Sequence, residues 1–170
     1  MPFTPFHFGL GAVLKAAIPR HFSFSVFCFA QVATDTEVLV HMARGGDQLH
    51  GYLHTYAGAV GVGLFSVAVG RPLCCRFLRW WCVQPQVPLK EFYGGSPEIS
   101  LFQAAGGAFI GSLSHVFFDS IMHADIHPLL PFNDSNSIFG VVGPGALHLA
   151  CFLLAVFGAL ICARIPNSKL

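Results

Sequence analysis

Four polar residues recur at four-residue intervals within an otherwise apolar stretch: His115, Asp119, His123 and His127. Residues four apart lie one above the other on an α-helix, so these side chains form a polar stripe with the lone pairs that a divalent metal needs. We expect Pro128 and the residue before it to end this helix. His123 lies about 80° around the helix from His115, so it and His127 could instead shape an entrance or bind a second ion.

Other histidines and carboxylates could complete a metal site. His50 and His54 are one helical turn apart, a spacing that places two imidazoles on one zinc ion. Asp35 and Glu37 are two apart and point to different helix faces, so we expect one ligand and one supporting residue, with Glu37 the weaker ligand candidate. The predicted metal ligands are His7, Asp35, His50, His54, His115, Asp119, His123 and His127, and the predicted general bases are Asp35 and Asp125.

The composition indicates that these residues lie in a membrane protein. Apolar residues make up 54% of the 170 residues and charged residues only 10%, and 18 glycines with 18 phenylalanines are typical of packed transmembrane helices. The sequence predicts an all-α, polytopic membrane helix bundle of about five helices that forms a single domain over residues 1–170. The predicted helices lie near residues 5–18, 22–42, 53–69, 101–122 and 138–163.

The basic residues predict an orientation for this bundle. If the helices alternate, eight of the nine lysines and arginines fall on one side, and only Arg44 falls on the other. By the positive-inside rule, the loop 70–100 and the C-terminus are cytoplasmic, and residues 123–137 face outward. The candidate ligands played no part in this assignment, yet they converge on the outer half, and His7 joins them if segment 5–18 crosses with its amino end outside. We therefore expect an integral membrane protein with its site at the outer face.

Several fragments resemble one protein family. The fragments are Met1–Gly9 (MPFTPFHFG), Thr34–Glu37 (TDTE), His50–Thr55 (HGYLHT) and Gly111–Asp119 (GSLSHVFFD). They resemble the bacterial inner-membrane metal-dependent hydrolases, which include a LexA-regulated member, and the resemblance runs from residue 2 to about residue 135. Glu37 stands where that family typically carries an aspartate, and Gly51 where it carries an arginine. More distantly, His115, Asp119 and the His127-Pro-Leu ending resemble the zinc-dependent phospholipase C and P1-nuclease superfamily, in which such residues bind a cluster of zinc ions.

The resemblance implies a hydrolase of the bacterial inner membrane that uses one or more ions of zinc or another divalent metal. A metal-activated water would attack a phosphoester or lipid-type substrate, with a lipid or lipid-linked phosphoester as the candidate and the bilayer as the expected partner. Nucleic-acid motifs are absent and the net charge is +1, so we expect no nucleic-acid partner.

Two alternatives to a hydrolase stay open. One is an ion or proton transporter that uses His and Asp as relay groups, and the other is a non-catalytic membrane scaffold. A transporter needs polar residues that continue to the cytoplasmic side. The inner half offers few of them, mainly Ser23, Ser25, Gln31 and Ser66.

Overall fold

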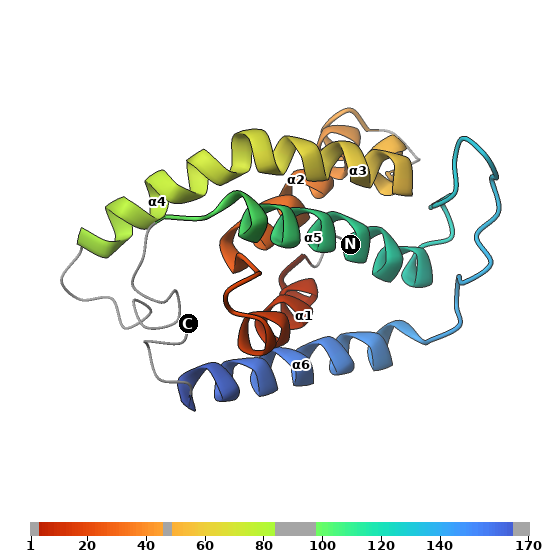
Figure 1. Cartoon of the computed structure of the whole chain (residues 1–170). Coiled ribbons are helices and arrows are strands. Elements are labelled where there is room, and N and C mark those ends of the chain that lie inside the picture. Colours follow the sequence, from red (N-terminus) through yellow and green to blue (C-terminus); the bar gives the residue numbers. More distant parts are fainter. Residues whose placement is uncertain (1–3, 46–48, 84–97, 165–170) are drawn as a thin grey trace.

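The computed structural model describes residues 4–45, 49–83 and 98–164, so the orientation predicted for residues 84–97 and for the last six residues lies outside the described residues. Within these ranges the fold is all-helical, has five helices and contains no strand, as the sequence predicts. The helices are α1 (Thr4–Ala17), α2 (Phe24–Ala43), a continuous helix built from α3 (Tyr56–Phe65), a π-helical turn (Ser66–Gly70) and α4 (Arg71–Val83), then α5 (Leu101–Met122) and α6 (Pro144–Arg164). Figure 1 shows α5 between α3 and α1, with α6 packed against α1.

Side-chain caps set the starts of two helices near the site. Thr55 precedes α3 and its hydroxyl accepts a hydrogen bond from the backbone N–H of Gly58 at 2.9 Å. Ser100 and Gln103 form a capping box at the start of α5, each side chain accepting from the backbone N–H of the other residue. Such caps satisfy amide groups that the first helical turn leaves without partners. As a result, α5 starts at residue 101, as the sequence predicts.

Three of the helices are long and apolar enough to cross a membrane. They are the α3–α4 helix over Tyr56–Trp81, α5 and α6. The described part of α1 is a shorter apolar helix. α2 has 20 residues, but Gln31, Asp35 and Glu37 interrupt its apolar sequence. The length and composition of these helices therefore support membrane association. The polar residues that interrupt α2 include Asp35, one of the predicted ligands.

The prediction that residues 70–100 form a loop is wrong for residues 71–83, which continue the third helix as α4. Pro72 indicated a helix break because proline has no amide hydrogen to donate. The π-helical turn directly before α4 allows the helix to continue past this residue. The buried side chains of Cys75 and Leu78 then pack in a core cluster with Ala104 of α5. This packing stabilises α4 against α5.

The fourth helix ends at Met122, at the end of the predicted range 101–122. The expectation that the polar stripe stays helical up to Pro128 is wrong. His123 adopts an extended backbone conformation (φ −120°, ψ 124°). The side-chain amide of Asn136 donates to the carbonyl oxygens of Ser120 at 2.8 Å and His123 at 3.3 Å. A residue from the following loop therefore satisfies carbonyls that the end of a helix leaves open.

The last helix begins later than the predicted range 138–163. α6 starts at Pro144, a residue that is favourable at the first position of a helix because its missing amide hydrogen is not needed there. Before it, Gly140 adopts the left-handed conformation (φ +73°), which favours glycine and interrupts helical geometry. The apolar residues between 138 and 143 therefore belong to the loop.

A glycine allows the two helices that carry most of the site to pack closely. A Cβ atom at Gly107 of α5 would lie 2.3 Å from the carbonyl oxygen of Ser23 and 3.1 Å from the amide nitrogen of Phe27. Backbone atoms cannot move away from such a contact as a side-chain end can, so α2 and α5 need a small residue here. Their close packing sets Asp35 of α2 opposite His115 of α5.

Candidate metal centre

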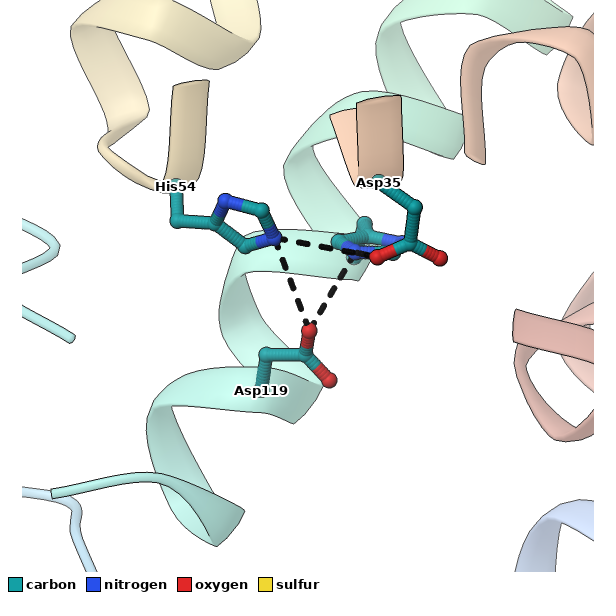
Figure 2. Close-up of side chains that lie close together, drawn as sticks. Asp35, His54 and Asp119 are labelled. Carbon is teal, nitrogen blue, oxygen red and sulfur yellow. Dashed lines mark ion pairs between the residues drawn. The ribbon is translucent and has the colours of Figure 1, made fainter. Parts of the chain in front are cut away.

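Four buried side chains from three segments of the chain meet at one place. His115 and Asp119 lie one turn apart on α5, Asp35 comes from α2, and His54 ends the short 3-10 helix Tyr52–His54 that precedes α3 (Figure 2). Each side chain offers one ligand atom, and these four atoms lie within 4.8 Å of one another. The structure thus brings together four of the predicted ligands in a group that could hold a metal ion.

The distances within this group fit a tetrahedral zinc site. Two ligand atoms bound to zinc at about 2.0–2.1 Å and at the tetrahedral angle lie about 3.3 Å apart. His115 Nε2 lies 3.2 Å from Asp35 Oδ1 and 3.2 Å from Asp119 Oδ2. His54 Nε2 lies 3.9 Å and 3.8 Å from the same two oxygens. A shift of His54 by about half an ångström would bring these two distances to the tetrahedral spacing.

The imidazoles of His54 and His115 each present their Nε2 atom to the carboxylates. Both residues are 0% exposed. Among the described residues, only four buried side-chain nitrogen or oxygen atoms have no hydrogen-bond partner, and two of these are His54 Nε2 and His115 Nε2. Each nitrogen nevertheless lies at ion-pair distance from two carboxylate oxygens, so the two adjacent negative charges need a proton or a cation between them. A divalent cation would bind both nitrogens and neutralise the two adjacent carboxylates.

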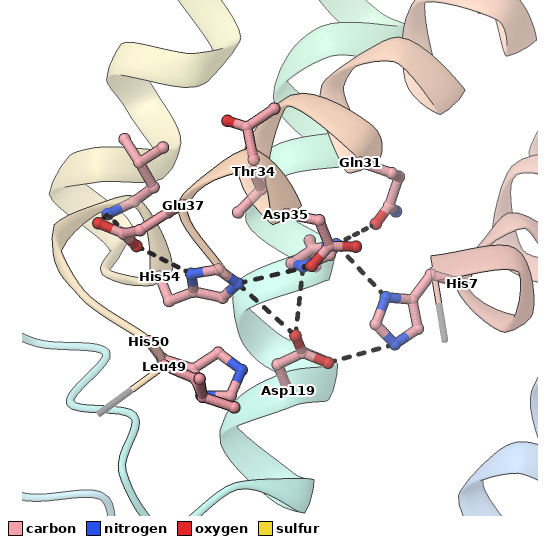
Figure 3. Close-up of polar contacts among 12 residues, drawn as sticks. His7, Gln31, Thr34, Asp35, Glu37, Leu49, His50, His54 and Asp119 are labelled. Carbon is pink, nitrogen blue, oxygen red and sulfur yellow. Dashed lines mark hydrogen bonds and ion pairs between the residues drawn. The ribbon is translucent and has the colours of Figure 1, made fainter. Parts of the chain in front are cut away.

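The second nitrogen of each imidazole is held by a side chain of α2 (Figure 3). His54 Nδ1 lies 3.1 Å from Glu37 Oε2, and His115 Nδ1 lies 2.6 Å from Gln31 Oε1. The Gln31 amide nitrogen donates to the hydroxyl of Ser114, which turns the amide oxygen toward His115. We therefore assign the ring hydrogen to Nδ1 in both histidines, which leaves the Nε2 lone pairs directed into the group. Metal-binding histidines are commonly oriented in this way.

Sequence reasoning missed the part that Gln31 plays in the site. It assigned Gln31 to the inner half of the bundle as one of a few scattered polar residues. The available signal was its position four residues before Asp35, which places both side chains on one face of α2.

Glu37 is not one of the four grouped ligands but holds one of them, His54, in place. Its carboxylate also accepts from the backbone N–H groups of Gly51 and Leu53 at 3.0 and 3.1 Å, which fixes the turn that carries His54.

The predicted ligand His7 lies beside the four-residue group. Its Nε2 is 3.4 Å from Asp119 Oδ1, and its Nδ1 is 3.4 Å from His115 Nδ1. Asp119 therefore directs one oxygen into the group and the other toward α1. With both ring nitrogens facing neighbouring side chains, His7 has the position of a residue that orients Asp119.

His50, His123 and Asp125 form a second group. Each offers one ligand atom, and the three atoms also lie within 4.8 Å of one another. Asp125 Oδ2 accepts a hydrogen bond from His50 Nδ1 at 2.9 Å, and the rings of His50 and His123 have centroids 4.5 Å apart. Burial acts to raise the pKa of Asp125, but the hydrogen bonds and charge of His50 outweigh it and hold this pKa below the ordinary value.

A cavity of about 340 Å³ adjoins the second group. Its wall includes Glu37, which holds His54, together with His50 and Asp125 of the second group. The His50 and His54 rings have centroids only 4.7 Å apart. The predicted ligand His127 lines this cavity and hydrogen-bonds to the backbone carbonyl of Asp134, but it belongs to neither group. The cavity can therefore bring a solute into contact with His50 and Asp125 of the second group.

Comparisons of the chain with protein-family models, curated proteins and solved structures find no match. The resemblance to inner-membrane hydrolases therefore stays a prediction from the motif fragments. The structure itself establishes an all-helical fold with membrane-length helices and a buried His/Asp group that could bind a metal.

Proposed function

We propose that this chain is a membrane-embedded, metal-dependent hydrolase of the bacterial inner membrane. In this proposal it acts at the outer face on a phosphoester or lipid-type substrate. The observation that carries the proposal is the convergence of the buried Nε2 atoms of His54 and His115 on the carboxylates of Asp35 and Asp119. When bound, zinc or a similar divalent ion supplies a water of lowered pKa and polarises a phosphoryl or acyl oxygen.

The side chains around the ligands support this function by fixing the ligands in advance. Glu37 and Gln31 hold the two imidazoles in the tautomer that directs a lone pair inward. His7 restrains the outer oxygen of Asp119. Such supporting contacts orient the ligands and raise their basicity, and losing one of them weakens metal binding about 10- to 100-fold in other proteins. A purely structural cluster of buried charges has no need for this arrangement.

The surroundings of the site support an amphipathic substrate. The cavity beside the group is lined by polar side chains, among them Glu37, His50 and Asp125, which suits a polar head group. A second cavity of about 410 Å³ lies between α2 and α3 and is almost entirely apolar, with Phe29 and Leu53 in its wall. Leu53 directly precedes His54, so the apolar cavity ends close to the candidate centre. A lipid could place its head group and one chain in these two spaces.

The transporter alternative has less support in the structure. Gln31 belongs to the candidate site through its contact with His115, and Ser23 caps the start of α2. Of the four inner-half residues that could form a proton relay, only Ser25 and Ser66 then remain without such a role. Two hydroxyl groups do not form a continuous proton path across the inner half of a bilayer.

Metal analysis of the full-length protein, purified in detergent without chelators, tests the proposal directly. We expect wild type to carry a transition metal, and Asp35→Asn and His115→Ala to lose it, because each removes one of four ligands. The matched control is His148→Ala, since the His148 ring packs against Phe6 and His148 belongs to neither ligand group. Wild type without a bound transition metal would refute the central claim.

Hydrolysis of lipid phosphoesters in detergent micelles provides the second test. We expect turnover by wild type and His148→Ala, loss of turnover in the two ligand variants, and recovery of chelated wild type when zinc is added. A protein that binds the metal but hydrolyses none of these lipids would contradict the enzymatic part of the proposal.

A further inference from the structure

The group formed by His50, His123 and Asp125 is not needed to complete the buried centre, yet it has the composition of a metal site. Two histidines and one carboxylate are a common ligand set of catalytic zinc ions, in which the remaining position is open to water or substrate. The Asp125 side chain is 39% exposed, and both His50 and Asp125 line the 340 Å³ cavity. This group therefore differs from the buried one in its access to solvent.

The two groups also differ in the number of ligands they supply. Asp35, His54, His115 and Asp119 provide four ligand atoms, enough to fill a tetrahedral zinc ion. An ion held by all four of these ligands can take a water only as a fifth ligand. The second group provides three ligand atoms and faces the cavity, so an ion there keeps a position for a water or a substrate oxygen.

The end of α5 creates the second group. On a continuous helix, His123 and Asp125 would lie about 200° apart and could not bind one ion. Because α5 ends at Met122 and His123 is extended, both side chains reach His50 instead. Asn136 supports this arrangement by donating to the carbonyl oxygen of His123. The carbonyl groups at this helix end also carry partial negative charge, which favours a cation.

We propose that His50, His123 and Asp125 bind a second, exchangeable divalent cation, and that this cation meets the phosphoryl or acyl oxygen of the substrate. The first part stands on the geometry of the group, and the second part rests on the proposed hydrolase function. Binding through His50 Nδ1 replaces the hydrogen that this nitrogen shares with Asp125 Oδ2, and the imidazole stays neutral by carrying its hydrogen on Nε2. The 2.9 Å spacing of these atoms is close to the roughly 3.3 Å between two ligands of one zinc ion. Asp125 then acts as a ligand rather than as the predicted general base.

Cation titration of the full-length protein in detergent tests this assignment. Cobalt(II) serves as the probe, because its binding is followed by absorbance and its stoichiometry by elemental analysis. We expect wild type to bind two cobalt ions per chain, one of which is removed by brief dialysis against a weak chelator. We expect Asp125→Asn and His123→Ala to lose the exchangeable ion and keep the tight one, and Asp35→Asn to lose the tight one. Retention of the tight ion shows that a variant is folded.

His127→Ala is the matched control, because His127 lines the same cavity but lies outside both groups. It should bind two cobalt ions. Wild type that binds a single ion, or Asp125→Asn that binds two, would overturn the assignment. The outcomes also separate the two proposals. One bound ion with lipid hydrolysis would refute the second site alone, whereas two ions without hydrolysis would refute the hydrolase and leave the second site in place.

Discussion

Glu37 offers a sharp test of the candidate centre because it touches no metal ligand except His54. Its Oε2 accepts three hydrogen bonds, from His54 Nδ1 at 3.1 Å and from the backbone N–H groups of Gly51 and Leu53 at 3.0 and 3.1 Å. Glu37→Gln keeps an oxygen at this point but removes the negative charge. Glu37→Ala removes the acceptor of all three hydrogen bonds and frees the His54 ring to rotate. The two changes therefore separate ligand basicity from ligand orientation.

We expect zinc affinity to fall in the order wild type, Glu37→Gln, Glu37→Ala. Loss of supporting contacts to metal-binding histidines costs about 10- to 100-fold in affinity, so we assign about tenfold to the glutamine variant and about 100-fold to the alanine variant. These factors correspond to about 1.4 and 2.7 kcal/mol of binding free energy. The assay is competition for zinc between the detergent-solubilised protein and a fluorescent chelator at pH 7.

Thr36→Ala is the control for this series. Thr36 is the adjacent residue, its side chain is exposed, and its hydroxyl bonds only to the Ala33 carbonyl of its own helix. It should bind zinc as wild type does. If both Glu37 variants bind zinc within about twofold of wild type, then His54 is not a ligand oriented by Glu37, and the inferred centre is incorrect.

Three further predictions test the packing, the metal and the orientation. Gly107→Ala should lower the free energy of unfolding by about 1–3 kcal/mol in thermal melts, because the added Cβ meets the Ser23 carbonyl oxygen. In the control Gly61→Ala the added Cβ meets no atom within 4 Å, so the free energy of unfolding should stay unchanged or rise. Zinc at about 1,000 times its dissociation constant should stabilise the protein by about 4 kcal/mol, so a strong chelator should lower the melting temperature, and an unchanged melt would argue against a folded-state site. In intact cells, an impermeant maleimide should label Ser135→Cys but not Arg79→Cys, both exposed positions, and the opposite result would reverse the predicted topology.

The sequence predicts much of the candidate centre because its ligands follow local rules. The four-residue spacing of His115 and Asp119 survives in α5, which occupies the predicted range 101–122. The supporting position of Glu37 follows from its two-residue offset from Asp35. The contacts of His7, in contrast, do not follow from local rules. Depth in the bilayer places it near the site, but only the packing of α1 decides that its nitrogens face Asp119 and His115.

The features that the sequence did not predict depend on contacts between distant segments. Asn136 binds the carbonyl of His123 from thirteen residues further along the chain, whereas the local stop signal, Pro128, lies beyond the observed end of α5. Pro72 is a helix breaker by local rules, and the π-helical turn that accommodates it is not encoded in a short motif. Gln31 acquires its role only because Ser114 and His115 lie opposite it on α5.

The ligands of the buried centre also constrain the order in which the protein can mature. Asp35 emerges with α2, His54 follows, and Asp119 becomes available only near the end of α5. During synthesis, a ribosome that has completed only the first half of the chain has produced two of the four ligands. A metal held by this group would therefore enter only after α5 has docked against α2. If the proposal is correct, cells short of metal should accumulate a fully translated form without the ion, and membrane proteases should degrade it faster.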